Sequence, residues 1–375
     1  MIKIIADHQI PFLKGALEPF AEMVYAPGNA INKAMLRDAD ALLIRTRTLC
    51  NKALLDNTNV KYIATATIGF DHIDTDYCRA QNIQWSNAPG CNSGSVMHYM
   101  ASALVRLSIK YNFHFSDKTI GIIGYGNVGS KVAKLASALG FKVLINDPPL
   151  HRAGKLKDHV PLEQLKKKAD IITLHVPLNK EGVDKTLFMV DHDFLASLKS
   201  SAILINTSRG NIVDNQQLKE ALQNKHIGGA VLDVWENEPQ LDKELLDLVA
   251  IATPHIAGYS VDGKANGTAM SVQALSDFFG FGLTNWRPNN VPKPSPSLII
   301  NDGLEKTEQA LFSEIVLSTY DILKDDKRLR NSVETFEKQR GAYPYRYEFY
   351  NYTIQLNSNL KKIEKQIRQL GFKTR

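Results

Sequence analysis

Residues 119–149 read TIGIIGYGNVGSKVAKLASALGFKVLINDPP, a pattern of strand, glycine-rich turn, helix and second strand within one βαβ unit. Gly124, Gly126 and Gly129 form a GxGxxG motif directly after the first strand. In such a unit the first glycine permits the tight turn, the second lets the backbone approach a pyrophosphate, and the third lets the helix pack on the strand. The helix N-terminus offers N–H groups to phosphates. This stretch predicts a doubly wound, dinucleotide-binding Rossmann domain.

An acidic residue at the end of the second strand indicates which dinucleotide binds. Asp147 can accept hydrogen bonds from both ribose hydroxyls of NAD, and it would repel the 2′-phosphate of NADP. Its neighbours Asn146, Pro148 and Pro149 supply no compensating cation. NAD is therefore the predicted cofactor, the alternative being a turn aspartate before a Pro-Pro stop.

Strand-like runs recur along the rest of the chain and alternate with helical stretches, which implies parallel sheets. They are IKIIAD (2–7), ALLIRT (41–46), KYIATAT (61–67), DIITLHVP (170–177), AILINTS (202–208), GGAVLDVW (228–235) and VAIATP (249–254). A chain of 375 residues is too long for one simple core. We expect an α/β protein in three parts: a discontinuous, flavodoxin-like substrate and lid domain (1–92 and 259–285), a Rossmann NAD-binding domain (93–258) and a C-terminal domain (286–375). The stretches 93–111 and about 262–281 are predicted to be long helices.

The C-terminal part is predicted to be a small α+β dimerisation domain. The run WRPNNVPKPSPS (286–297) has the proline content of an extended linker. Helices are expected at about 304–325 and 358–370, and the aromatic run 343–352 alternates as in a strand, as core or as interface. A domain of this size buries a modest fraction of its surface and often needs a partner. The homodimer expectation rests on this, on the aromatic run and in part on the family resemblance described below.

Composition narrows the functional class. The chain is 44% hydrophobic and 22% charged, as in ordinary globular proteins, and no apolar run reaches the length of a membrane span. Cys50, Cys78 and Cys91 form no plausible disulfide framework, which favours the cytoplasm, and no Cys/His spacing predicts a metal site. The net charge of +6 resides in residues 340–375, with eight Lys/Arg against two Glu. Without an RNA-binding or helix-turn-helix signature, this tail is interpreted as a solvated helix face, not a nucleic-acid site.

Three chemically active side chains each lie in a short loop after a strand-like run: Arg209 in INTSRGNIVD, Glu238 in DVWENEP and His255 in TPHIAG. A guanidinium can hold a substrate carboxylate, an imidazole can move a proton, and a carboxylate can orient that imidazole. Separately they fit a surface arginine, a helix-starting glutamate and a buried structural histidine. Together, downstream of the dinucleotide motif, they favour a 2-hydroxy-acid dehydrogenase.

These motifs also carry a family resemblance. GYGNVG, INTSRG, DVWENEP and TPHIAG, in this order, resemble the D-isomer-specific 2-hydroxy-acid dehydrogenases. ATATIGFDHID, NAPGCNSGSV, HIAGYSVDGKANGT and the C-terminal YDILKDDKRLR and YRYEF resemble the branch that oxidises 4-phospho-D-erythronate. The resemblance spans essentially the whole chain. It implies NAD-dependent oxidation at C2 to (R)-3-hydroxy-2-oxo-4-phosphooxybutanoate, on the route to pyridoxal 5′-phosphate.

The resemblance also implies residue roles. His255 would accept and donate the C2 hydroxyl proton, Glu238 would orient His255, and Arg209 would bind the substrate carboxylate. Substrate contacts are implied for Thr46, Thr67 and Tyr259. Cofactor contacts are implied for Gly124, Gly126, Asn127, Val128, Gly129, Asp147, His175, Val176, Asn206, Thr207, Ser208, Asp233 (to the nicotinamide carboxamide) and Gly258. Many family members have a small polar residue where this chain has Val176, so only its backbone is expected to contact the cofactor.

Two other functions compete with this one. A related enzyme could act on another 2-hydroxy acid, such as 3-phosphoglycerate, and an NAD-sensing, corepressor-like scaffold could use the same fold. The complete Arg–Glu–His set argues against the scaffold. The C-terminal tail favours the phosphoerythronate branch.

Overall fold

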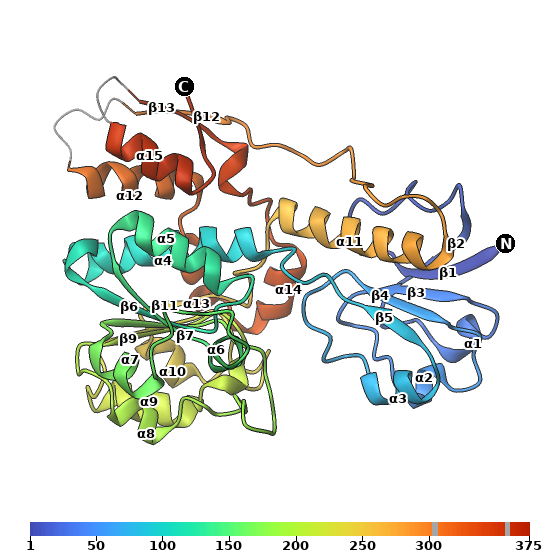
Figure 1. Cartoon of the computed structure of the whole chain (residues 1–375), viewed down its shortest axis with the longest axis horizontal. Coiled ribbons are helices and arrows are strands. Elements are labelled where there is room, and N and C mark those ends of the chain that lie inside the picture. The colour runs from blue at the N-terminus through green and yellow to red at the C-terminus, as the bar shows by residue number, and fades with distance from the viewer. Residues whose placement is uncertain (302–306, 357–360) are drawn as a thin grey trace. The chain divides into compact units, whose positions relative to one another are not determined.

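The computed structural model describes residues 1–301, 307–356 and 361–375, with residues 361 and 362 as backbone only. The chain forms two compact units, one of residues 1–92 and 260–293 and one of residues 93–259 and 294–375 (Figure 1). The expected helices at 304–325 and 358–370 begin partly outside the described residues.

The first unit is a five-stranded parallel sheet with strand order β2-β1-β3-β4-β5, the flavodoxin-like order expected for this part. Its strands are β1 (Ile2–Asp7), β2 (Ala21–Ala26), β3 (Ala41–Ile44), β4 (Tyr62–Thr65) and β5 (Gln84–Ser86). Its helices are α1 (Lys33–Leu36), α2 (Lys52–Leu55), α3 (Thr75–Ala80) and α11 (Val261–Phe279). Apolar clusters cover both faces of the sheet, and α11 contributes Val272 and Leu275 to one of them.

The second unit contains a six-stranded parallel sheet with order β11-β10-β9-β8-β6-β7. Its strands are β6 (Thr119–Ile123), β7 (Lys142–Asn146), β8 (Ile171–Leu174), β9 (Ile203–Asn206), β10 (Gly229–Leu232) and β11 (Ile251–Ala252). A single bridge between Ile145 and His159 lies beside β7, where a Rossmann sheet has a further strand. Strand order reverses between β6 and β8. In such sheets ligands bind at the carboxyl ends of the strands beside this point.

Helices of this unit surround the sheet. They are α4 (Ser93–Lys110), α5 (Gly129–Leu139), α6 (Pro148–Arg152), α7 (Leu162–Lys168), α8 (His192–Ala196), α9 (Asn215–Gln223) and α10 (Lys243–Leu248). The expected long helix at 93–111 is α4, which is almost entirely buried.

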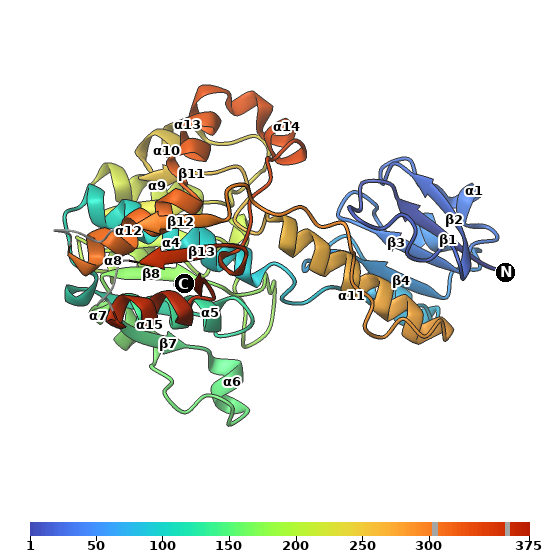
Figure 2. The same cartoon turned by 90° about the horizontal axis from the view of Figure 1, so that it is seen from above.

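The C-terminal segment adds a small α+β layer to the same unit (Figure 2). A three-stranded parallel sheet, β12-β13-β14, is made by Leu298–Asn301, Thr353–Leu356 and Lys373–Thr374. Its helices are α12 (Glu308–Thr319), α13 (Leu323–Asn331), α14 (Phe336–Gly341) and α15 (Lys361–Gln369). Contacts join α12 to α4 and α15 to α5.

Two expectations for this segment are wrong. One helix was expected up to residue 325, but α12 ends at Thr319 because Tyr320 is extended and Asp321 turns to pair with Arg106. The aromatic run does not form a strand either. Residues 343–352 are irregular apart from a short 3₁₀ turn, and strand pairing starts only at Thr353. Tyr343, Phe349 and Tyr352 are buried, whereas Tyr345 and Tyr350 are exposed.

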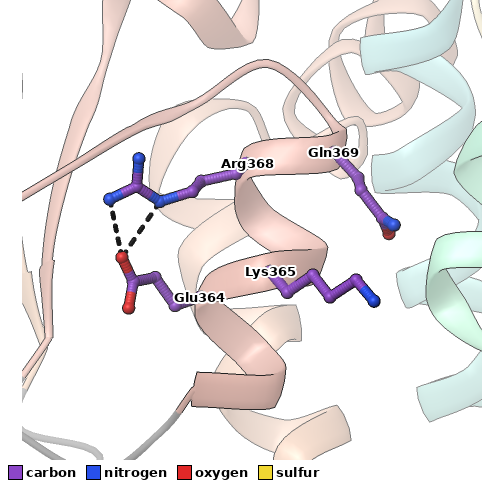
Figure 3. Close-up of a pocket in the computed structure, with 4 residues that line it drawn as sticks. All are labelled: Glu364, Lys365, Arg368 and Gln369. Atoms are coloured by element: carbon purple, nitrogen blue, oxygen red, sulfur yellow. Dashed lines mark hydrogen bonds and ion pairs between the residues drawn. The ribbon is translucent and has the colours of Figure 1, made fainter.

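The basic tail is partly an amphipathic helix surface. In α15, Ile363 and Ile367 are buried, while Lys365 and Arg368 are exposed. Arg368 pairs with Glu364 one turn earlier, and a shallow pocket along this face is lined by α15 residues alone (Figure 3). For this helix the expected solvated face is confirmed. The same expectation is wrong for Arg346, which belongs to the basic tail but is buried.

Candidate active site

The glycine-rich turn between β6 and α5 has the geometry that a dinucleotide needs. Gly124 has φ +89°, and a Cβ there would lie 2.4 Å from the carbonyl oxygen of His175. A Cβ at Gly129 would lie 1.9 Å from the carbonyl oxygen of Gly124. Gly126 faces open space, and Asn127 beside it is exposed. The turn therefore leaves room for a pyrophosphate beside the exposed backbone ahead of α5, whose first residue follows Val128.

Asp147 lies directly after β7 and caps the short helix α6. Its Oδ1 accepts the Leu150 N–H at 2.9 Å, and its Oδ2 accepts the Tyr125 N–H at 2.7 Å. The second bond ties the carboxylate to the glycine-rich turn. Asp147 thus stands beside the predicted pyrophosphate site, where a carboxylate can accept from ribose hydroxyls.

Five predicted cofactor residues lie at or just after the carboxyl ends of the next two strands, β8 and β9. His175 and Val176 follow β8, and the Thr173 hydroxyl lies 3.0 Å from His175 Nε2. Burial lowers the pKa of His175 to about 3, so this imidazole is neutral. Asn206 ends β9, and its Oδ1 accepts from both the N–H and the hydroxyl of Ser208. Thr207 lies between them, with its hydroxyl 3.4 Å from His175 Nδ1.

Arg209 follows this turn and is partly exposed. Asn206 Nδ2 donates to the Arg209 carbonyl at 2.9 Å, and Arg209 Nη1 donates to the Ser208 carbonyl at 2.8 Å. Because Asn206 is fully buried, it fixes the turn from which the guanidinium projects. The sequence placed Asn206 against the cofactor, whereas in the structure its side chain is engaged in holding this turn.

Glu238 and His255 are joined by a direct hydrogen bond. Glu238 Oε2 lies 2.8 Å from His255 Nδ1, and Glu238 Oε1 accepts the Trp235 N–H at 2.9 Å. Burial acts to raise the pKa of Glu238, but the hydrogen bond and charge of His255, the Trp235 N–H and the nearby Arg340 outweigh it and lower that pKa. An ionised Glu238 accepts a hydrogen bond from the Nδ1–H of His255, which leaves Nε2 as the basic nitrogen of the ring. The sequence predicted this pairing from two separate loops.

Asp233 supports the loop that carries His255. This buried residue follows β10, and its Oδ1 accepts the Thr253 hydroxyl at 2.6 Å and the Ile256 N–H at 2.8 Å. Its Oδ2 accepts the Ala257 N–H at 2.9 Å. Burial raises the pKa of Asp233, although each of these donors and the charge of His255 lowers it. The carboxylate is thus engaged with residues 253–257, while the resemblance assigned it to the nicotinamide carboxamide.

One charged group near this pair was missed from the sequence. Arg340, at the end of α14, lies with its guanidinium carbon 6.0 Å from the centre of the Tyr259 ring and donates to Glu337. Its charge helps lower the pKa of Glu238. No motif marks Arg340, because the contact comes from a segment about 100 residues further along the chain. Gly258 and Tyr259 lie in the loop after His255, as expected.

The predicted substrate residues Thr46 and Thr67 belong to the first unit. β3 ends at Ile44, so Arg45, Thr46 and Arg47 lie in a loop, where their side chains need not alternate between the two faces of a strand. Thr46 is exposed. The Thr67 hydroxyl lies 2.7 Å from that of Thr65 and donates to the Gly69 carbonyl at 2.9 Å.

Comparison with known proteins assigns the chain to a family. The profile of the D-isomer specific 2-hydroxyacid dehydrogenase NAD-binding domain matches residues 104–257, and that of a domain of unknown function, DUF3410, matches residues 294–371. An erythronate-4-phosphate dehydrogenase of Bacteroides thetaiotaomicron is 47% identical over 354 residues, which cover 94% of this chain and 99% of that one. The chain belongs to the erythronate-4-phosphate dehydrogenase family.

A second member of that family is similar in sequence over the full length of this chain. The erythronate-4-phosphate dehydrogenase of Yersinia enterocolitica is 37% identical and is matched over 100% of this chain and 99% of its own length. Among solved structures, the D-lactate dehydrogenase of Aquifex aeolicus with NAD and lactic acid is similar with a TM-score of 0.62. It is 27% identical and covers 75% of this chain and 96% of its own.

The profile matched by residues 104–257 is that of an NAD-binding domain, and this chain is an NAD-dependent dehydrogenase. The cofactor prediction is therefore confirmed at the level of the family, and the open glycine-rich turn beside Asp147 fits it. Among the described residues, no cluster of His, Cys, Asp and Glu could hold a metal ion. The search of the same residues for a membrane-spanning helix gave none.

Proposed function

We propose that this dehydrogenase oxidises 4-phospho-D-erythronate at C2 to (R)-3-hydroxy-2-oxo-4-phosphooxybutanoate, a step towards pyridoxal 5′-phosphate. The observation that carries the proposal is the 2.8 Å pair of Glu238 and His255 in the NAD-binding unit. The full-length similarity to erythronate-4-phosphate dehydrogenases supports the choice of acid.

The residues divide the reaction among them. His255 accepts the C2 hydroxyl proton at Nε2, and Glu238 holds the ring in the required tautomer and stabilises the imidazolium that forms. Arg209 binds the substrate carboxylate through two parallel N–H donors. NAD, when bound, accepts the hydride that leaves C2. Because the carboxylate, the hydroxyl and the hydride acceptor are fixed separately, C2 has one productive orientation.

A panel of hydroxy acids tests the proposal. NADH formation is measured with 4-phospho-D-erythronate, D-erythronate, 3-phosphoglycerate and D-lactate. We expect the highest kcat/KM for 4-phospho-D-erythronate. A higher value for 3-phosphoglycerate would identify the related enzyme, and NAD binding without turnover of any acid would favour the scaffold.

The carboxylate of Glu238 should control the pH dependence of the reaction. Replacing Glu238 with Gln removes the negative charge that stabilises the imidazolium form of His255. The imidazole therefore stays neutral down to a lower pH, and it is also a weaker base for the C2 hydroxyl proton. We expect kcat to fall about 100-fold and the acidic limb of the kcat/KM profile to move to lower pH.

Glu236→Gln is the matched control, because Glu236 lies in the same loop but accepts the Asn215 N–H. That variant should keep the wild-type pH profile. An unshifted acidic limb in Glu238→Gln would remove Glu238 from this role.

The loop after β3 is the proposed phosphate contact. Thr46→Ala or Arg47→Ala should raise KM for 4-phospho-D-erythronate more than for D-erythronate, because only the first substrate offers a phosphate. Both constants come from steady-state NADH formation. Equal losses with the two acids would exclude these residues from phosphate recognition.

The C-terminal part of the chain, residues 286–375, is also the proposed homodimer contact. Among the described residues of this segment, five large apolar side chains are exposed: Leu298, Ile300, Leu323, Tyr345 and Tyr350. Association with a second copy would cover such a surface. A cytoplasmic location is proposed because the three cysteines, Cys50, Cys78 and Cys91, form no disulfide with one another in the structure.

A further inference from the structure

Arg346 is a buried arginine in the aromatic run of the C-terminal segment, and only 5% of it is exposed. Its Nη2 donates to two consecutive backbone carbonyls, that of Ile256 at 3.0 Å and that of Ala257 at 2.5 Å. These carbonyls follow His255 directly. The guanidinium carbon also lies 4.5 Å from the centre of the Tyr320 ring.

The same two residues are also held by Asp233. Their N–H groups donate to the carboxylate of Asp233, at 2.8 Å for Ile256 and 2.9 Å for Ala257. Asp233 therefore takes the donors of this loop and Arg346 takes its acceptors. The clamp, defined here as Asp233 and Arg346, fixes the peptide groups next to His255.

His255 needs such support because of its backbone conformation. Its φ is +55°, in the left-handed region that non-glycine residues seldom adopt and that persists where the surroundings enforce it. Within the clamp the His255 N–H also donates to the Asp233 carbonyl at 2.7 Å. If the loop relaxed, Nε2 would move relative to the substrate hydroxyl while the Rossmann sheet stayed intact.

Buried side chains in turn hold Arg346. Asp325, on α13, accepts the hydroxyls of Tyr320 and Tyr343 at 2.8 and 2.6 Å. The charges of Asp325 and Asp233 both act on the Arg346 guanidinium. The position of the His255 loop is thus linked through α13 and the aromatic run to the C-terminal segment.

We infer that Arg346 is a positioning residue for catalysis, and that the C-terminal segment acts on the active site within its own chain in addition to any role in dimerisation. The positioning role of Arg346 applies to whichever 2-hydroxy acid the wild type oxidises best. It can therefore be tested independently of the proposed substrate.

Arg330 provides a matched control. It also extends from the C-terminal segment and donates to two carbonyls of the Rossmann part, those of Leu246 and Val249, while pairing with Asp326. These carbonyls lie before β11, away from the His255 loop. Arg330→Met should lower the melting temperature and leave kcat within about three-fold of wild type.

Arg346→Met should instead lower kcat about 100-fold, the effect of a misplacement of about 1 Å at a reacting group. The dissociation constant of NAD, measured by protein fluorescence, should change less than about three-fold. In Arg346→Met the primary isotope effect on kcat, measured with substrate deuterated at C2, should be at least as large as in wild type, because the slowed hydride transfer limits the rate. Arg346→Lys, which keeps the charge but has one compact donor group, should be intermediate and serves if the Met variant does not fold.

The opposite results would overturn the inference. Arg346 variants with kcat equal to that of Arg330→Met, at comparable melting temperature, would show a structural role alone. Arg346 variants that lose NAD affinity but keep the wild-type kcat would also show that Arg346 does not position His255 for catalysis.

Discussion

His255→Asn is expected to lower kcat about 1000-fold while NAD binds as in wild type. A positioned general base contributes roughly 10²- to 10⁴-fold, and the amide of asparagine cannot accept the hydroxyl proton. Asparagine is chosen because it tolerates a positive φ, so the +55° backbone at this position is not further strained. The measurement is steady-state NADH formation, together with NAD titration by fluorescence.

A surface histidine supplies the control for this substitution. His192 is exposed on α8 and lies 3.2 Å from Asp193, so it also has a carboxylate neighbour. His192→Asn should keep wild-type kcat. A His255→Asn enzyme within ten-fold of wild type would mean that another group removes the proton.

Arg209→Met is expected to lower kcat/KM about 1000-fold, or about 4 kcal/mol, the loss typical of removing one partner from a buried charge pair. The loss should appear mainly in KM for the acid if Arg209 binds the carboxylate equally in ground and transition states. NAD affinity should be unchanged.

Two comparisons sharpen that experiment. Arg209→Lys retains the positive charge but loses the two parallel N–H donors of the planar guanidinium. Its kcat/KM should therefore lie between those of wild type and Arg209→Met. With a substrate amide in place of the carboxylate, Arg209→Met and wild type should differ little. A full 1000-fold difference on the amide would mean that Arg209 binds another part of the substrate.

Local sequence patterns predicted most of the fold because parallel α/β units carry strong periodic signals. The glycine-rich turn, Asp147 after β7 and the long helix α4 all follow from residues close to one another in the chain. β2 and β5 were missed, since their side chains are only partly buried and their runs lack a marked apolar pattern. The aromatic run alternates like a strand, yet Arg346 and its ring partners impose an irregular path there.

Site residues could be named from motifs, but their contacts could not. The pairing of Glu238 with His255 joins two loops and was expected from chemistry. In contrast, the hydrogen bonds of Asp233 to the loop of residues 253–257 could not be predicted, because they depend on how that loop packs around the buried carboxylate. Arg340 and Arg346 were not selected at all, because each reaches the site from a segment whose packing no local pattern records.

The most direct test of the account follows the hydrogen at C2. Purified enzyme is mixed with NAD and 4-phospho-D-erythronate that carries deuterium at C2, and both products are examined by mass spectrometry. The account predicts one deuterium in the NADH formed, and a 2-oxo acid that retains its phosphate. Deuterium released to solvent, or no NADH from this acid, would contradict it.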